Sequence, residues 1–132
     1  MNKLIFFLIF CTMMFAATTP PPFTEEDEID FYEQLQDELA ASENQVHALV
    51  MEKANNRTIF THRRQVQLDS AKNAMETKYT LYSNFYQTPS IQSPQVRRIL
   101  LYIFQSDEVT TDDLQNLQTA VLQWQRRKKE TQ

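Results

Sequence analysis

The chain has 132 residues and contains no glycine. Glycine is the residue that most easily adopts positive φ angles, so tight β-hairpins, β-bulges and phosphate-binding loops usually depend on it. Its absence disfavours a β-rich fold and the common nucleotide-binding loops. Gln, Glu, Leu, Ala, Lys and Arg are abundant instead, and these residues favour helices. We therefore expect an all-α protein.

The first 17 residues have the features of a secretory signal peptide. Lys3 precedes an apolar run that extends from Leu4 to Phe15, and the small residues Ala16 and Ala17 follow. A basic start, an apolar centre and a small-residue exit are typical of such a leader. The run is shorter than the roughly 20 apolar residues that span a bilayer, although an uncleaved membrane anchor is the alternative. We expect the leader, 1–17, to be removed and the protein to be secreted and extracellular.

Cleavage of the leader leaves about 115 residues, enough for one domain with a single core. Cys11 is the only cysteine and departs with the leader, so disulfides cannot stabilise the mature chain. Consecutive prolines make 18–23 an extended linker. We expect a helical domain over 24–127 and a basic, polar tail over 128–132.

Capping residues predict how the first part of the domain is divided. Thr24, followed three residues later by an acid, begins a helix over 25–40. Ser42 has the same kind of signal and predicts a second, short helix over 43–54. An uninterrupted helix over 25–54 is the alternative, with this serine facing solvent. The expected buried face of the first helix comprises Ile29, Tyr32, Leu35 and Leu39, with Phe31 beside it.

Three further helices follow. Apolar spacing predicts a long central helix over 58–87, then a helix over 94–105 that begins at Ser93 with proline next, and a fifth helix after Thr110. The expected buried residues of the long helix are Leu68, Ala71, Met75, Tyr79, Tyr82 and Phe85, and those of the fifth helix are Leu114, Leu117, Val121 and Trp124. The whole is predicted to be a small bundle of about five helices, in which two helix-turn-helix pairs flank the long central helix.

The charges are unevenly distributed. Nine acids and no Lys or Arg lie between Thr24 and Glu43, whereas the middle of the chain is basic, and the formal net charge is −4. We interpret these runs as solvated helix faces that attract one another, and the alternative is an acidic surface that gathers cations. Nucleic-acid binding is disfavoured for an acidic secreted domain.

No residue pattern indicates catalysis. His47 and His62 fall on different elements without obvious ligand partners, and a strand-to-helix turn that exposes a nucleophilic serine would need glycine. We therefore expect a protein that is not an enzyme and has no certain cofactor. Asn56, in the sequence Asn-Arg-Thr, is a candidate N-glycosylation site in an exposed loop.

The segment between the last two helices resembles the exit of an EF-hand loop, with Val109, Thr110 and Asp113 at the matching places. A standard calcium loop is excluded, since Tyr102 and Phe104 would occupy the first and third ligand positions. Mg²⁺ needs only one or two carboxylates because it keeps most of its waters. A weak Mg²⁺ site therefore stays open, while the alternative is that the same acids cap the helix and face water: Asp107, Glu108, Asp112 and Asp113.

Several short motifs together resemble the nematode SXP/RAL secreted proteins. They are Pro-Pro-Phe at 21–23, the segment from Ser93-Pro94-Gln95-Val96 through Ile103, and Val109-Thr110 with Leu114-Gln115. The resemblance covers most of 20–124 and is closest to members with the cation-binding domain named after an anisakid allergen. It implies a small all-α secreted antigen that binds a divalent cation, Mg²⁺ in preference to Ca²⁺. Related chains carry a glycine-containing turn between early helices and more Lys-Glu pairs in the central helix, and this chain has neither.

A second interpretation is a secreted carrier of lipid or another small hydrophobic ligand. The aromatic residues that motivate it are Phe60, Tyr79, Tyr82, Phe85, Phe104 and Trp124. Such a carrier needs a sizeable apolar cavity, whereas an interaction protein has a filled core. For the SXP/RAL-like antigen, a host or extracellular protein is the expected partner, and no stable membrane anchor is expected.

Overall fold

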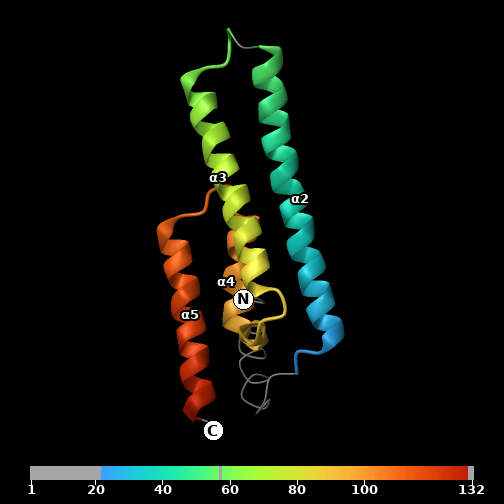
Figure 1. Ribbon diagram of the computed structural model, residues 1–132, viewed down its shortest axis with the longest axis vertical. Coiled ribbons are helices and arrows are strands. Elements are labelled where there is room, and N and C mark those ends of the chain that lie inside the picture. Colours follow the sequence, from blue (N-terminus) through green and yellow to red (C-terminus); the bar gives the residue numbers. More distant parts are fainter. Residues whose placement is uncertain (1–21, 57, 131–132) are drawn as a thin grey trace, which may run out of the picture.

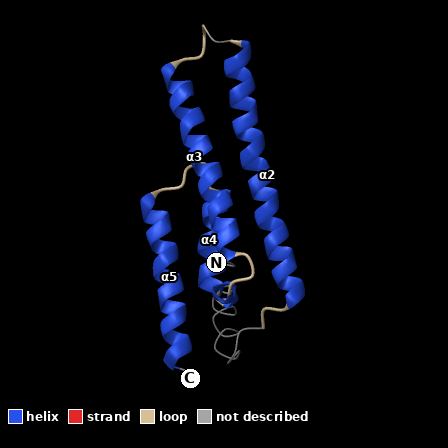
Figure 2. Cartoon of the chain, viewed as in Figure 1, coloured by secondary structure: helices blue, strands red, loops and turns tan. Residues whose placement is uncertain are grey.

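The computed structural model describes residues 22–56 and 58–130. The helices of this part of the chain are joined by loops, and it contains no strand (Figure 2), so the all-α prediction is confirmed. The elements are α2 (Glu25–Asn55), α3 (His62–Phe85), the short 3₁₀ helix η1 (Pro89–Gln92), α4 (Pro94–Gln105) and α5 (Thr111–Glu130). The predicted signal peptide and most of the predicted linker lie outside the described residues.

The acidic N-terminal segment forms one long helix, α2. The prediction of two helices over 25–40 and 43–54 is therefore wrong. The alternative of one uninterrupted helix is correct, but its expectation that Ser42 faces solvent is wrong. Ser42 does not cap a second helix, because it is buried in mid-helix and its hydroxyl accepts a hydrogen bond from Lys78 Nζ at 2.7 Å. The cap at Thr24 is confirmed, since its Oγ1 accepts the Asp27 N–H at 3.1 Å and the carboxylate accepts the Thr24 N–H at 3.0 Å.

Helix α3 starts later than predicted. Thr61 is its N-cap and accepts the Arg64 N–H at 3.2 Å, so the helix begins at His62 and not at residue 58. The residues before the cap form a turn, in which the Ile59 N–H donates to the Asn56 carbonyl at 3.1 Å. The longest helix of the described part is therefore α2, with 31 residues against 24 in α3.

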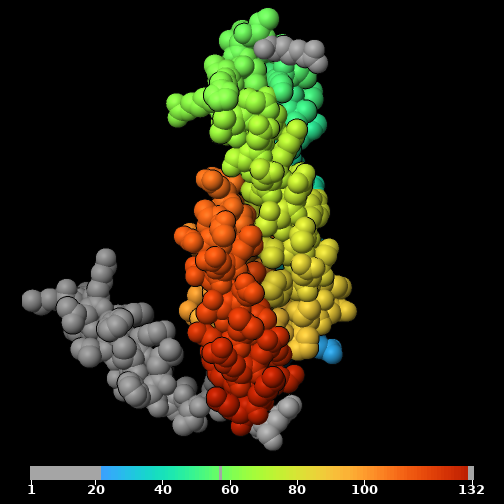
Figure 3. All heavy atoms as spheres, turned by 60° about the vertical axis from the view of Figure 1, so that its left-hand side comes forward, coloured from blue at the N-terminus to red at the C-terminus, as the bar shows by residue number. Residues whose placement is uncertain are grey.

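The helices form two antiparallel hairpins. α2 packs along α3, α4 packs against α2, and α5 packs against α4 and η1 (Figure 1). The α4–α5 hairpin covers only the lower part of the longer α2–α3 hairpin, whose tip extends past the start of α5 (Figures 1 and 3). The predicted central helix between two flanking pairs is thus replaced by one hairpin packed on another. α5 continues through Glu130, so that 128–130 of the predicted tail are helical.

The core has two parts of unequal size. The main core lies where both hairpins meet, and its buried residues are Phe31, Tyr32, Leu35, Leu39, Leu81, Ile91, Val96, Leu100, Ile103, Phe104, Leu117 and Ala120. The second core lies between α2 and α3 nearer the tip and consists of Val46, Leu49, Leu68 and Ala71, with Phe60 and Met75 against it. Burying a side chain of this kind contributes about 1.5–3 kcal/mol each. The main core therefore carries most of the stability.

Some predicted core positions are at the surface. Ile29 is 58% exposed, Tyr79 is 42% exposed and Leu114 is 38% exposed. On α3 the buried stripe is offset from the aromatic one and consists of Leu68, Ala71, Ala74, Lys78 and Leu81. The reason is that α3 carries two neighbouring apolar stripes, and the helices that pack on it cover only one of them fully.

The end of α3 shows how a chain without glycine makes a sharp turn. Gln87 has a φ of 59°, which is the left-handed region that glycine usually occupies. Its N–H donates to the Tyr32 hydroxyl at 2.6 Å, which holds the residue in place. For a residue with a Cβ atom this conformation costs roughly 1 kcal/mol or more.

Replacing Gln87 with glycine should stabilise the protein by about 0.5–1 kcal/mol, because the relief of backbone strain exceeds the added entropy of the unfolded chain. Thermal and urea unfolding of the two proteins would measure the difference. Gln118→Gly, at an exposed position inside α5, is the control and should destabilise by about 1 kcal/mol. A loss of stability in Gln87→Gly would contradict the prediction.

Candidate functional site

A buried lysine joins three of the helices. Lys78 is 3% exposed, and its ammonium donates at 2.7 Å to the hydroxyl of Ser42 on α2 and at 2.7 Å to the carbonyl of Ser106. Ser106 is the C-cap of α4, where helix carbonyls lack partners and the helix dipole is negative. The ammonium therefore satisfies one of these carbonyls and ties α3 to both α2 and α4.

The surroundings of Lys78 shift its titration. Burial lowers the pKa of the ammonium below its usual 10.5, and the carboxylates of Asp107 and Glu38 oppose the shift. Two of the three N–H donors of the ammonium are used inside the fold, on Ser42 and Ser106. We therefore assign this lysine a structural role.

The four acids of the predicted cation site lie around the start of α5. Asp113 forms a capping box with Thr110, since its carboxylate accepts the Thr110 N–H at 3.0 Å and its own N–H donates to Thr110 Oγ1 at 3.2 Å. Glu108 lines a notch against α3, whereas Asp113 lines a groove between α4 and α5. Asp107 is exposed and lines a further groove together with Glu108, and Asp112 is exposed. The structure therefore places two of these carboxylates in different grooves.

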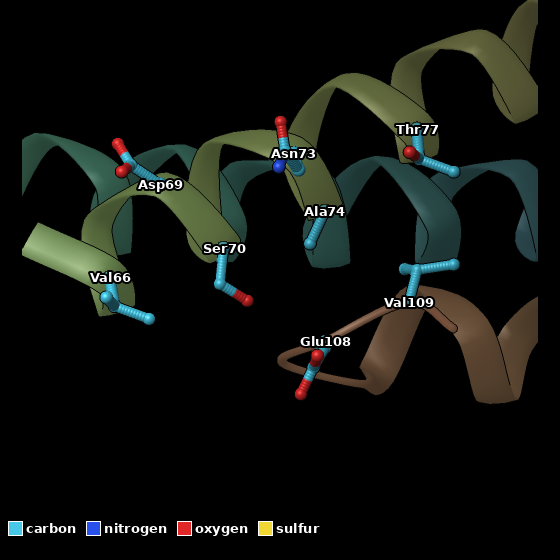
Figure 4. Close-up of a pocket in the computed structure, with 8 residues that line it drawn as sticks. All are labelled: Val66, Asp69, Ser70, Asn73, Ala74, Thr77, Glu108 and Val109. Atoms are coloured by element: carbon cyan, nitrogen blue, oxygen red, sulfur yellow. The ribbon is translucent and has the colours of Figure 1, made fainter. Parts of the chain in front are cut away.

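The notch beside Glu108 has a volume of about 350 Å³ and lies between α3 and the turn that leads into α5 (Figure 4). Asp69 lines the same notch from α3, but the two carboxylates point in different directions (Figure 4). Within residues 22–56 and 58–130, no three His, Cys, Asp or Glu side chains are grouped so that they could hold a metal ion. Cation binding by the four predicted acids stays a prediction.

The remaining sequence candidates are at the surface. His47 and His62 are exposed and lie on α2 and α3 respectively. Asn56 is exposed at the tip of the α2–α3 hairpin, which is a position open to a glycan, and its modification stays a prediction. The neighbouring ion pair joins the two helices, with Arg64 Nη2 at 2.8 Å from Glu52 Oε2.

A row of tyrosines lies along the junction of α2 and α3. The ring centroid of Tyr86 is 4.9 Å from that of Tyr32 and 5.7 Å from that of Tyr82. The rings of Tyr82 and Tyr86 are stacked. The Tyr82 hydroxyl accepts a hydrogen bond from Gln36 Nε2 at 2.9 Å. Tyr79 continues the row one turn earlier on α3 and borders a groove of about 300 Å³ between the two helices.

We call this surface the tyrosine face. It is defined by Ile29, Tyr32, Gln36, Ala40 and Glu43 of α2, by Tyr79 and Tyr82 of α3, and by Tyr86, the C-cap of α3. Its groove is lined by α2 and α3 residues alone. Tyr79 and Tyr86 are 42% and 48% exposed, so their rings are available to a partner. Sequence reasoning assigned Tyr79 to the core, whereas the structure buries the neighbouring stripe that contains Ala74.

A second groove lies between α4 and α5 and has a volume of about 380 Å³. Its lining residues are Gln95, Arg98, Ile99, Tyr102, Asp113, Asn116 and Thr119, and none of them is buried. A ligand in this groove would stay largely exposed to water, whereas sites for small hydrophobic molecules usually bury most of the ligand.

Comparison with known proteins finds no family model that matches the chain, and neither the curated proteins nor the solved structures include a significant match. None of the helices in the described part is both long and apolar enough to cross a membrane. The interpretation of this chain therefore depends on its own residues and geometry.

Replacing Lys78 with methionine, which has a similar length, should destabilise the protein by about 1–3 kcal/mol, because the Ser106 carbonyl loses its buried partner. The pH dependence should also change. The folded pKa lies below 10.5, so wild-type stability should rise relative to the methionine variant as the pH increases through the range just below 10.5. Urea unfolding at several pH values would measure both effects. An unchanged stability difference across that range would contradict the pKa direction.

Proposed function

We propose that this protein is a secreted, non-enzymatic helical protein of the SXP/RAL kind that acts by binding an extracellular protein partner through its tyrosine face. The observation that carries the proposal is the row of tyrosines along the junction of α2 and α3, of which Tyr79 and Tyr86 are 42% and 48% exposed. Tyrosine is enriched at protein interfaces because it offers a large apolar ring together with a hydroxyl that can hydrogen-bond. A row of such rings is thus suited to protein recognition.

The packing of the tyrosines supports this proposal. The Tyr32 hydroxyl donates a hydrogen bond to the Phe85 carbonyl and accepts one from the Gln87 N–H, and Tyr86 packs on the Tyr32 ring. Burial raises the pKa of the Tyr32 hydroxyl above 10.0, with the nearby Glu28 carboxylate adding to the shift, so it is protonated at neutral pH. A rigid surface loses little conformational entropy on binding.

A carrier of lipid or another small hydrophobe is the second candidate. The groove between α4 and α5 favours it, because Ile99 and Tyr102 offer apolar surface and Arg98 offers a positive charge for a carboxylate head group. We rank this function lower, since every residue that lines the groove is at least partly exposed.

Protein recognition can be tested by placing a photo-crosslinking phenylalanine derivative at position 79 of the secreted chain. Illumination in extracellular fluid should capture a protein, and unlabelled wild-type protein should compete with the capture while the Tyr79→Ala variant competes poorly. The same derivative at position 102, an exposed tyrosine on α4, is the control and should capture no such partner. Equal capture at both positions, or capture without competition, would contradict the proposal.

The resemblance adds a weak divalent cation to the proposal, at the turn between α4 and α5. Calorimetric titration of the mature protein with millimolar Mg²⁺ should give a small heat that exceeds the one given by Ca²⁺. Asp112→Asn together with Asp113→Asn should abolish it, whereas Asp37→Asn on the exposed face of α2 should not. Because Asp113 also caps α5, thermal unfolding must show that the double variant is still folded. The absence of any heat with the wild-type protein would remove the cation from the proposal.

A further inference from the structure

The tyrosine face lies in strongly acidic surroundings. α2 carries nine acids and no Lys or Arg between Thr24 and Glu43. On α3, Lys78 is the only basic residue between Glu76 and Tyr86, and its ammonium is buried against Ser42 and Ser106. These two segments therefore contribute no exposed cation, and Arg97 of α4 offsets only Asp27 at the start of α2.

Two of these carboxylates belong to the face itself or adjoin it. Glu43 lines the groove together with Tyr79 and Tyr82. Burial raises the pKa of the Tyr32 hydroxyl, and the negative charge of the Glu28 carboxylate adds to the shift. Aromatic faces attract Arg and Lys side chains through cation–π interactions, and an adjacent carboxylate strengthens the preference for a cation.

The shape of the face favours a helix as its occupant. Two antiparallel helices present a shallow groove between them, and an amphipathic helix can lay its apolar side into such a groove. Ala40 lines the groove and is exposed, and its short side chain permits a close approach, while Tyr79 adds apolar surface. An extended peptide binds by pairing its backbone with the free edge of a sheet, and two helices do not offer such an edge.

We propose that the tyrosine face binds a cationic amphipathic helix of a partner protein, with Arg or Lys side chains directed at the tyrosine rings and at Glu28 and Glu43. This inference rests on the proposed function and names the class of partner. A second copy of this chain is disfavoured, because a symmetric contact would bring two acidic faces together and like charges repel.

A direct test uses two synthetic helices of roughly 18 residues, about five turns. Both carry leucines along one side, and one has arginines on its flanks where the other has glutamates. The secreted chain should bind the arginine helix and not the glutamate helix, and fluorescence anisotropy would give both affinities. Binding should weaken as the salt concentration rises, because exposed charges are screened.

Point variants locate the binding surface. Tyr79→Ala and Glu43→Gln should each raise the Kd for the arginine helix about tenfold or more, whereas Leu122→Ala, at an exposed apolar residue of α5, should leave it unchanged. Both altered residues are exposed, so circular dichroism and thermal unfolding should show an intact fold. A wild-type Kd that is the same for both helices, no binding of the arginine helix, or a Kd unaffected by Tyr79→Ala would overturn the inference.

Two further outcomes separate this inference from the proposed function. If position 79 captures a partner while the arginine helix does not bind, the cationic class is wrong and the recognition function stands. If sedimentation shows a wild-type dimer that Tyr79→Ala dissociates, the face joins two copies of the chain and the inference is overturned.

Discussion

The arrangement of the helices depends on the ammonium of Lys78. This ammonium belongs to α3 and donates hydrogen bonds to Ser42 of α2 and to the carbonyl of Ser106 at the end of α4. One buried charge therefore fixes the relative positions of three helices. Burying an ammonium is costly, and the cost is offset only when its hydrogens find acceptors in good geometry. Registers that slide α3 along α2 would separate Lys78 from Ser42. This lysine therefore selects one register of the hairpin, which apolar contacts alone would specify less sharply.

The same residue explains where sequence reasoning succeeded and where it failed. Caps at Thr24, Ser93 and Thr110 were predicted correctly, because a cap is a local hydrogen bond between residues a few positions apart. Ser42 has the same local appearance, yet its hydroxyl serves a lysine 36 positions away. Only the tertiary packing of α3 distinguishes a helix start from a buried acceptor in mid-helix.

The tyrosines and the acids illustrate a second limit. Helical periodicity identified the apolar stripes of α3, but the choice between neighbouring stripes depends on where α2 and α4 pack. The stripe with Ala74 and Leu81 is buried, and the stripe with Tyr79 stays partly exposed. The four acids near α5 are close in sequence, yet Asp113 is held by its cap and Glu108 faces α3. Proximity along the chain therefore does not bring all four carboxylates to one place, because Asp113 belongs to α5 whereas Glu108 lies in the loop before it.

The unequal lengths of the two hairpins give the molecule regions of different stability. Near the tip, the second core has only two layers, and four buried side chains hold α2 to α3 there. The main core is enclosed by both hairpins and by η1. Amide protons near Asn55 and His62 consequently exchange with solvent through local opening of the tip. Those near Leu35 and Leu100 exchange only when the whole domain unfolds. Proteases that require an unfolded segment will meet the tip of α2–α3 first.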